Sequence, residues 1–252
     1  MTLATIDPQN LFAVRFFWLK IDGLIVTLGY LLGSIPFGYL IGRLRGIDIR
    51  QHGSGNIGAT NVTRVLGKKF GYSVFAGDAL KGIAAVMIGN HLALDHALTF
   101  EHVRQVGQVI YHDTYFTRLP PSIGSISAAI ACIIGHNFPI WLGFKGGKGM
   151  ATSAGVLIGM IPMTAVSCML LWLVVFLATR YVSLASIVAA IALPLVTMVF
   201  LVLGFIHGWP YFYFTVAACI LAVWRHRSNI VRLMNGTENR FEKKPKPEEA
   251  AN

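Results

Sequence analysis

The chain has 252 residues, of which 55% are hydrophobic and only 13% are charged, and its mean hydropathy is +0.62. A soluble domain normally carries about a quarter charged residues, so the composition argues against an ordinary soluble globular protein. The net charge of +10 suggests a nucleic-acid binder, but the basic residues concentrate between long apolar segments, which argues against a nucleic-acid partner.

The first apolar segment, residues 23–42, reaches the ~20 residues that a helix needs to cross a membrane. It begins too late for a signal peptide and lacks a small-residue cleavage site, so we expect a retained helix. The loop that follows, residues 43–71, carries six basic side chains and is expected in the cytoplasm, which places the N-terminus outside. Four small residues should let this helix pack closely against others: Gly29, Gly33, Ser34 and Gly38.

Two further spans are expected at residues 72–92 and 123–142. The long loop between them, residues 90–120, holds three acidic and two basic side chains, which suits the outer face. Pro162 and Arg180 divide the remaining apolar sequence, and the charge rule places Arg180 on the cytoplasmic face. The segments expected there are 150–161, 163–179, 183–207 and 209–224.

These segments predict an all-α fold, a polytopic membrane helix bundle of about seven transmembrane helices with the N-terminus outside and the C-terminus cytoplasmic. Residues 150–161 would be only ~18 Å long as a helix, too short to span alone, so five spans are the alternative. We expect residues 1–240 to form a single integral membrane domain and residues 241–252 to be a disordered cytoplasmic tail. The three cysteines lie inside apolar segments and predict buried core positions, with no disulfide or metal framework.

A polar segment at residues 51–64 (QHGSGNIGATNVTR) interrupts the apolar pattern and contains no carboxylate. Its G-x-G-x-x-G spacing matches a dinucleotide-binding fingerprint, but membrane helices flank it where a βαβ unit is required, so we reject that interpretation. Glycines let backbone N–H groups approach an anion, and Arg64 offers a bidentate fork for phosphate. Neutral donors come from Ser54, Asn56, Thr60 and Asn61. A flexible, turn-rich loop is the alternative.

A second polar segment spans residues 135–152 (GHNFPIWLGFKGGKGMAT). It is not a Walker A loop, because Gly149 follows Lys148 where that motif has Ser or Thr. Lys145 and Lys148 precede the short helix expected next, whose amino end favours anionic groups. Anchoring of both lysines at the membrane interface is the alternative, and a structural role is the favoured interpretation for His136.

A third polar segment, residues 224–238 (WRHRSNIVRLMNGTE), places His226, Asn229 and Arg232 on one face if it is helical. Arginines are routine at a cytoplasmic helix end, but an Asn and a His on the same face indicate a site.

Asp78 and Lys81 form an i, i+3 pair of opposite charge inside the second span. Charges within a membrane helix are costly and usually face the bundle interior, so we expect this pair to bond internally or to brace a site. All three polar segments are expected on the cytoplasmic face. Together they predict a phosphate-binding site that opens beside lipid.

The segments contain HGSGNIGATNVTR, GFKGGKGMAT and RHRSNIVRL followed by GTE, which resemble, in this order, the three motifs of the bacterial acyl-phosphate:glycerol-3-phosphate acyltransferase family. The resemblance runs from Leu31 to Phe241 and includes DALKG and RYVSLASI. It implies a seven-helix enzyme of the bacterial inner membrane whose active site faces the cytoplasm. The implied reaction transfers a fatty acyl group from acyl phosphate to the sn-1 hydroxyl of glycerol 3-phosphate. It yields lysophosphatidic acid and inorganic phosphate, the first acylation step of phospholipid synthesis.

The resemblance and the donor chemistry together nominate site residues. The catalytic candidates are Ser54, Arg64, Lys148, His226 and Asn229. The substrate-binding candidates are Gly53, Gly55, Asn56, Thr60, Gly146, Gly147, Gly149 and Ser186. Structural roles are expected for Asp78, Lys81 and Glu238.

An acyl phosphate is already activated, so we expect no metal, no cofactor and no strong nucleophile. The proton acceptor is either His226 or a substrate phosphate with a second pKa of about 6, and we favour the substrate. The expected partners are acyl phosphate, glycerol 3-phosphate, membrane lipids and a soluble enzyme that forms acyl phosphate.

Three other functions fit the sequence less well. A transporter of phosphate or a phosphorylated metabolite is the main alternative, but its charges should approach the membrane midplane from both sides. A coenzyme-A-dependent acyltransferase should carry an H-x-x-x-x-D motif, which this sequence lacks. A non-catalytic scaffold leaves the three anion-binding segments unexplained.

Overall fold

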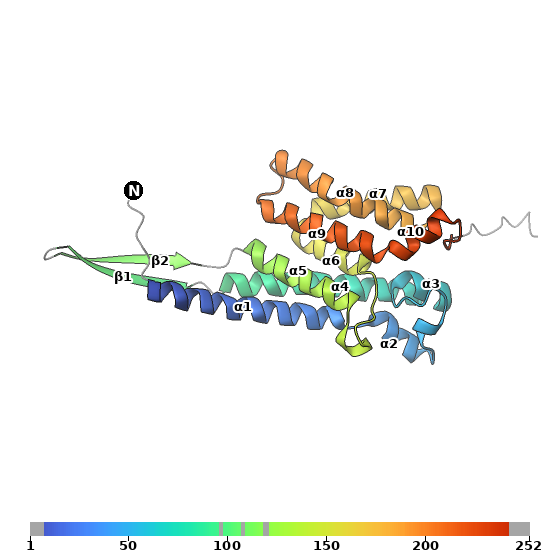
Figure 1. Ribbon diagram of the computed structural model, residues 1–252, viewed down its shortest axis with the longest axis horizontal. Coiled ribbons are helices and arrows are strands. Elements are labelled where there is room, and N and C mark those ends of the chain that lie inside the picture. Colours follow the sequence, from blue (N-terminus) through green and yellow to red (C-terminus); the bar gives the residue numbers. More distant parts are fainter. Residues whose placement is uncertain (1–7, 96–97, 107–108, 118–120, 242–252) are drawn as a thin grey trace, which may run out of the picture. The chain divides into compact units, whose positions relative to one another are not determined.

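The structure is a computed structural model that describes residues 8–95, 98–106, 109–117 and 121–241. The described chain is helical apart from one pair of strands, so the predicted helix bundle is confirmed with that exception (Figure 1). It divides into two compact units, which we call the first unit (Met1–Met160) and the second unit (Ile161–Asn252). The prediction of one domain over residues 1–240 stays a prediction.

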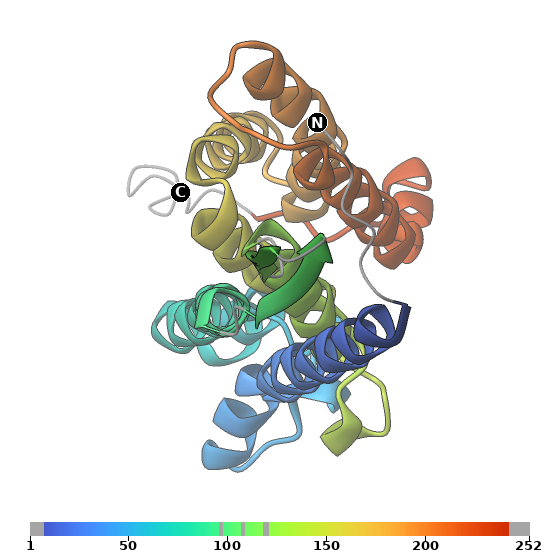
Figure 2. The ribbon, with the colours of Figure 1, turned by 90° about the vertical axis from the view of Figure 1, so that its left-hand side faces the viewer.

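Long helices dominate the first unit. In it α4 packs against α1, α5 and α6, and α1 packs against α5. The end-on view of Figure 2 shows α1 in blue beside α4 in teal and α5 in green. The helices of this unit are α1 (Pro8–Ser34), α2 (Phe37–Leu44), η1 (Ile49–Gln51), α3 (Ala59–Leu66), α4 (Lys68–Asp95), α5 (Pro121–Asn137), η2 (Ile140–Leu142) and α6 (Met150–Met160).

The first predicted span is two helices and not one. α1 ends at Ser34 and α2 begins at Phe37, because Pro36 lacks the N–H that would continue the helical hydrogen bonding. The predicted close packing is confirmed: a Cβ built on Gly33 would overlap the backbone of Cys132 in α5.

The predicted outer loop at 90–120 contains a hairpin of β1 (Leu98–Val106) and β2 (Val109–Thr117). The strands are antiparallel, and their register runs from Leu98 opposite Thr117 to Val106 opposite Val109. The sequence carries the signal for this hairpin, because two runs rich in β-branched and aromatic residues are separated by only two residues.

The second unit contains four helices within residues 161–241, and α8 packs against both α7 and α9. At its end, Arg240 Nε donates to the Thr179 carbonyl at 3.1 Å, and Phe241 N donates to the Arg180 carbonyl at 3.1 Å. The rest of the predicted disordered tail, residues 242–252, lies outside the described residues. The helices are α7 (Pro162–Thr179), α8 (Val182–Val202), α9 (Trp209–Arg225) and α10 (Arg227–Met234).

Two of the seven predicted spans are shorter helices, since α6 has 11 residues and α9 has 17. The count of seven and the orientation of the termini therefore stay predictions. Within the described ranges, five segments are long and apolar enough to cross a membrane: Leu19–Leu44, Lys68–Leu94, Ser122–Leu142, Pro162–Thr179 and Val182–Val202.

Candidate active site

Asn61 organises the first polar segment from a buried position in α3. Its Nδ2 lies 2.8 Å from the Asn56 carbonyl, 3.0 Å from that of His52 and 3.3 Å from that of Ile49. Its Oδ1 accepts a hydrogen bond from Ser54 N at 2.8 Å. One carboxamide, which both donates and accepts, therefore holds four backbone positions of the loop.

Several backbone amides of this loop are already bonded within it. Besides Ser54 N, Gly55 N donates to a loop carbonyl at 3.0 Å, and Gly58 N donates to Asn56 Oδ1 at 2.7 Å. Gly53 and Gly55 have φ angles of +60° and +70°, which residues other than glycine rarely adopt. The anion-binding role predicted for amides in this segment therefore does not fall to these three. The exposed side chain of Ser54 offers a hydroxyl donor in this loop.

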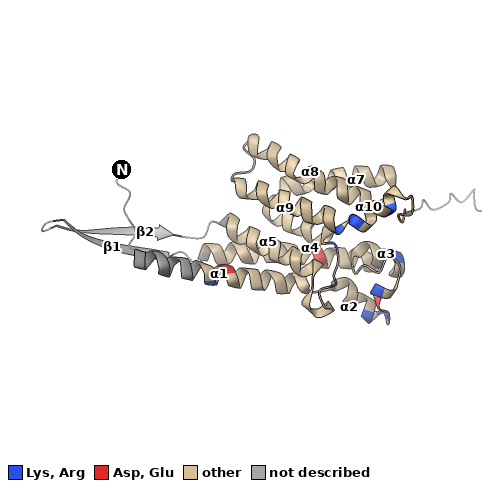
Figure 3. Cartoon of the chain, in the orientation of Figure 1, with Lys and Arg blue, Asp and Glu red and all other residues tan. Residues whose placement is uncertain are grey.

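The carboxylate that precedes the loop, Asp48, is paired with Arg50. Arg50 Nε and Nη2 donate to Asp48 Oδ1 and Oδ2 at 2.9 and 2.7 Å. Hydrogen bonding from Arg50 lowers the pKa of Asp48 to about 2. This acid is therefore neutralised by its own neighbour, and basic residues surround the segment from α2 to α3 (Figure 3).

Thr60 and Arg64 lie on α3, one helical turn apart, and both are half-buried. Residues spaced i, i+4 are neighbours on one helix face, so the two side chains emerge together. Their shared face supplies a hydroxyl and a guanidinium, two donors suited to phosphate oxygens.

The second polar segment folds back along the end of α5. Gly146 N donates to the Asn137 carbonyl at 3.2 Å, and Gly147 N donates to the His136 carbonyl at 3.1 Å. The predicted structural role of His136 fits its burial, since its exposed fraction is 4%. The glycine-rich turn is therefore tied to the last residues of α5.

Lys148 stands between this turn and α6. Gly149 follows it with a φ of +78°, and α6 begins at the next residue. The first N–H groups of a helix have no intrahelical partner and carry partial positive charge. A cationic side chain and a helix amino end thus lie together in the sequence and in the fold, as predicted.

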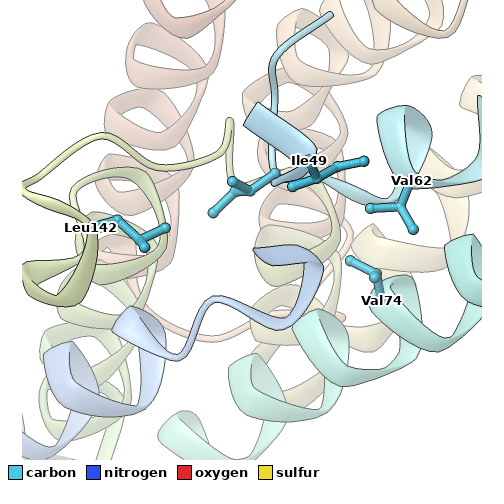
Figure 4. Close-up of a cluster of buried hydrophobic side chains, with 5 residues drawn as sticks. Ile49, Val62, Val74 and Leu142 are labelled. Carbon is cyan, nitrogen blue, oxygen red and sulfur yellow. The ribbon is translucent and has the colours of Figure 1, made fainter. Parts of the chain in front are cut away.

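One apolar cluster joins the first two polar segments. Ile49, Val62, Val74 and Leu142 are buried in it, and they come from η1, α3, α4 and η2 (Figure 4). Leu142 belongs to the turn that leads to Lys148, whereas Val62 belongs to the helix that carries Arg64. Both segments are therefore anchored on the same core within the first unit.

The charged pair in α4 is buried, and it bonds internally as predicted. Lys81 Nζ lies 2.8 Å from Asp78 Oδ1, and the side chains are 2% and 3% exposed. Lys81 also donates to the Ile35 carbonyl at 2.8 Å and lies 3.1 Å from His136 Nδ1. The ammonium group therefore joins α4 to α5 and to Ile35, the residue that follows α1.

The third polar segment is two helices, because α9 ends at Arg225 and α10 begins at Arg227. Glu238 lies beyond α10 and accepts from Asn229 Nδ2 and Arg232 Nε, each at 2.7 Å. Burial raises the pKa of Glu238, but the hydrogen bonds to its carboxylate, of which that from Asn229 has the largest effect, and the charge of Arg232 more than offset this and hold the pKa below its usual value. A charged carboxylate therefore orients the Asn229 amide.

His226 occupies the break between α9 and α10 and is buried, with 4% of the residue exposed. Its Nδ1 lies 2.8 Å from the Ala222 carbonyl, which can only accept, so Nδ1 carries a proton. Ser186 is buried in α8 and accepts a hydrogen bond from Trp172 Nε1 at 3.1 Å.

The structure thus forms two groups of site candidates, one in each unit. The first unit holds the candidates of the first two polar segments, and the second unit holds Ser186, His226 and Asn229. That the groups form one site stays a prediction. Among the described residues, no three His, Cys, Asp or Glu side chains form a metal-binding group.

Sequence reasoning missed two contributions. It treated Asn61 as one donor among several, although this residue holds the loop together. It did not connect His136 to Lys81, because the two residues are 55 positions apart and no local pattern links them.

Comparison with known proteins agrees with the motifs. The family model for glycerol-3-phosphate acyltransferase matches residues 23–236. A glycerol-3-phosphate acyltransferase of Halalkalibacterium halodurans is 41% identical over 229 residues, which cover 90% of this chain and 98% of that one. The Aquifex aeolicus protein of the same name is 42% identical over 221 residues, which cover 86% and 97%.

Two crystal structures of PlsY, an integral membrane glycerol 3-phosphate acyltransferase, share 38% sequence identity with the chain. The glycerol 3-phosphate form gives a TM-score of 0.70 and covers 88% of this chain and 96% of that one. The lysophosphatidic acid form gives a TM-score of 0.68 and covers 88% and 95%. Motifs, family match and fold agree, and the chain belongs to the glycerol-3-phosphate acyltransferase family of integral membrane enzymes.

Proposed function

We propose that this acyltransferase uses acyl phosphate as its donor and acylates the sn-1 hydroxyl of glycerol 3-phosphate. The products are lysophosphatidic acid and inorganic phosphate. The observation that carries the proposal is in the first unit, where the segments bearing Ser54, Arg64 and Lys148 are anchored on one apolar core. Neither segment, 51–64 or 135–152, contains a carboxylate that would repel a phosphate.

Acyl phosphate is already an activated donor, so the protein need not supply a strong nucleophile. The hydroxyl oxygen of glycerol 3-phosphate attacks the acyl carbonyl carbon, and the bond from that carbon to the phosphate oxygen breaks. Lys148, Arg64 and the Ser54 hydroxyl stabilise the negative charge on the carbonyl and on the departing phosphate. Holding the two substrates together supplies a further part of the rate enhancement.

The hydroxyl proton goes to a substrate phosphate, whose dianion accepts it at neutral pH because its second pKa is about 6. His226 then binds and orients substrate. Its ring is fixed by the Nδ1 contact to the Ala222 carbonyl at 2.8 Å. Asn229 is oriented by Glu238 in the same segment, and Ser186 in α8 is a further substrate-binding candidate.

The site opens to the cytoplasm at the bacterial inner membrane, and the basic residues from α2 to α3 support this orientation. A soluble enzyme that makes acyl phosphate is the partner that this donor requires.

The test is to incubate the purified protein with acyl phosphate and glycerol 3-phosphate and to follow phosphate release. We expect release that depends on glycerol 3-phosphate, and none of the product when acyl-CoA replaces acyl phosphate. Lys148→Met should abolish most of the activity, whereas Lys145→Met, an exposed lysine of the same turn, should retain it. Product formation from acyl-CoA alone would overturn the donor, and uptake of glycerol 3-phosphate into proteoliposomes without product would favour a transporter.

A further inference from the structure

The ammonium group of Lys81 has three partners from three elements of the first unit. It lies 2.8 Å from Asp78 Oδ1, 2.8 Å from the Ile35 carbonyl and 3.1 Å from His136 Nδ1. Ile35 stands at the break between α1 and α2, so its carbonyl lies where the helix is interrupted. An ammonium has three N–H groups, and this geometry gives each of them a partner.

The same contacts hold one side of the His136 ring. Its Nδ1 lies 3.1 Å from Lys81 Nζ and 3.4 Å from Asp78 Oδ1. The ring is thereby fixed on one side by the charged pair in α4. Ionisable groups inside a membrane bundle are costly and usually serve a site.

The other side of the ring meets the glycine-rich turn. A Cβ built on Gly147 would overlap His136 Nε2, and its next nearest neighbours, at 3.0 Å, are also atoms of this ring. Gly147 N donates to the His136 carbonyl at 3.1 Å. Gly147, the residue before Lys148, therefore packs directly against the His136 ring.

We propose that His136 is a positioning residue for substrate binding. Its imidazole, held by Lys81 and Asp78, forms the seat of Gly147, and through Gly147 it sets the position of Lys148 and of the amino end of α6. The inference rests on the proposed role of Lys148 in binding a phosphate. Position 147 is glycine because the imidazole fills the space that a side chain would need.

Equilibrium binding of glycerol 3-phosphate to the purified protein tests this without any acyl donor. His136→Asn keeps an acceptor for Lys81 near the position of Nδ1 but removes Nε2. We expect it to weaken binding about tenfold, because a displacement well below 1 Å at Lys148 loosens a charge-assisted contact. The midpoint of thermal unfolding should change little, whereas a merely structural role would lower it and leave the affinity of the folded fraction unchanged.

A compensation experiment gives the sharper outcome. Gly147→Ala alone should weaken binding about 100-fold, because the new Cβ overlaps the ring. The double variant His136→Asn/Gly147→Ala should bind within about threefold of His136→Asn alone, since the overlap is gone. Gly146→Ala is the matched control, because its Cβ would overlap the His136 carbonyl and the Pro139 ring, and His136→Asn cannot relieve that.

The inference would be overturned if the double variant His136→Asn/Gly147→Ala bound no more tightly than Gly147→Ala. It would also be overturned if His136→Asn restored the affinity of Gly146→Ala to the same extent. If His136→Asn does not fold, His136→Ala takes its place in both the binding and the compensation experiment, because it removes the same ring atoms. The acyl-phosphate donor is tested by a separate measurement, the release of phosphate by the unaltered protein. An inactive protein with the expected compensation refutes the donor, and an active protein without compensation refutes the role of His136.

Discussion

The side-chain amide of Asn229 donates to the carboxylate of Glu238, with 2.7 Å between Nδ2 and Oε1. The other carboxylate oxygen accepts from Arg232 Nε, also at 2.7 Å. Glu238, a structural candidate, therefore orients Asn229, a catalytic candidate, so a change at Glu238 should also affect the reaction.

Glu238→Gln should lower both stability and activity. Hydrogen bonds to a charged group contribute about 1.5–3 kcal/mol, and the new amide would face the Arg232 guanidinium, donor against donor. We expect a lower midpoint of thermal unfolding in detergent and a reduced turnover at temperatures where the variant is folded. Glu248→Gln, in the predicted tail, is the control; equal effects of the two substitutions would contradict this role for Glu238.

Acidification should remove the contribution of Glu238. Its pKa lies below the usual value, so the charged carboxylate stabilises the fold above the unfolded-state pKa of about 4.3. This stabilisation is lost as the pH falls through the lower pKa of the folded state. The difference in unfolding midpoint between the unaltered protein and Glu238→Gln should be constant at neutral pH and shrink below about pH 4. A difference that grows on acidification would contradict this sign.

Asn61→Asp should disrupt the first polar segment. An aspartate can accept from Ser54 N but cannot donate to the carbonyls that Asn61 now holds. The Ile49 and His52 carbonyls keep a backbone donor, whereas the part-buried Asn56 carbonyl loses its bond from Asn61, at a cost of roughly 1–3 kcal/mol. We expect a lower unfolding midpoint and a loss of acyl transfer. Gln51→Ala, an exposed neighbour, should change neither quantity, and an unaltered Asn61→Asp enzyme would refute the role of this side chain.

The buried pair in α4 should show strong coupling. Lys81→Met removes the ammonium partner of the buried Asp78 charge, and breaking a buried pair in this way costs about 3–5 kcal/mol. Adding Asp78→Asn removes that charge, so the double variant should be more stable than Lys81→Met alone. Unfolding midpoints of the single and double variants in detergent measure the coupling, and simple additivity would contradict it.

His226→Gln separates the two candidate proton acceptors. If a substrate phosphate takes the proton, the variant should raise KM for glycerol 3-phosphate while kcat falls less than about tenfold. A histidine acting as general base contributes roughly 10²–10⁴-fold, so a loss of that size in a folded variant would assign the proton to His226.

Much of the molecule could be predicted from the sequence, because its determinants are local. The apolar segments predict the long helices, and Pro162 marks the start of α7. The polar motifs give the family, since Ser54, Arg64, Lys148, His226 and Asn229 stand within short stretches whose order and spacing are specific. Asp78 and Lys81 could be paired because an i, i+3 spacing places them on one helix face.

Local patterns also misled in identifiable ways. Hydropathy averages over a window, so it joined α1 and α2 across Pro36, and it did not separate the strands Leu98–Val106 and Val109–Thr117 from a loop. Composition suggested that the amides of the first polar segment bind anions. Three of them instead bond inside the loop, because a turn of this length must satisfy its own backbone donors.

The sequence by itself determined the class of the protein, its family and the residue types of the site, since these depend on composition and on short motifs. Only the tertiary structure decided that Asn61 holds the first loop, that Leu142 shares a core with Val62, and that His136 stands between Lys81 and Gly147. The contacts of Leu142 with Val62 and of His136 with Lys81 join residues far apart along the chain, whereas those of Asn61 depend on how the loop folds around its side chain. Which distant side chains meet depends on how helices pack, and no local pattern of charge or hydropathy records that.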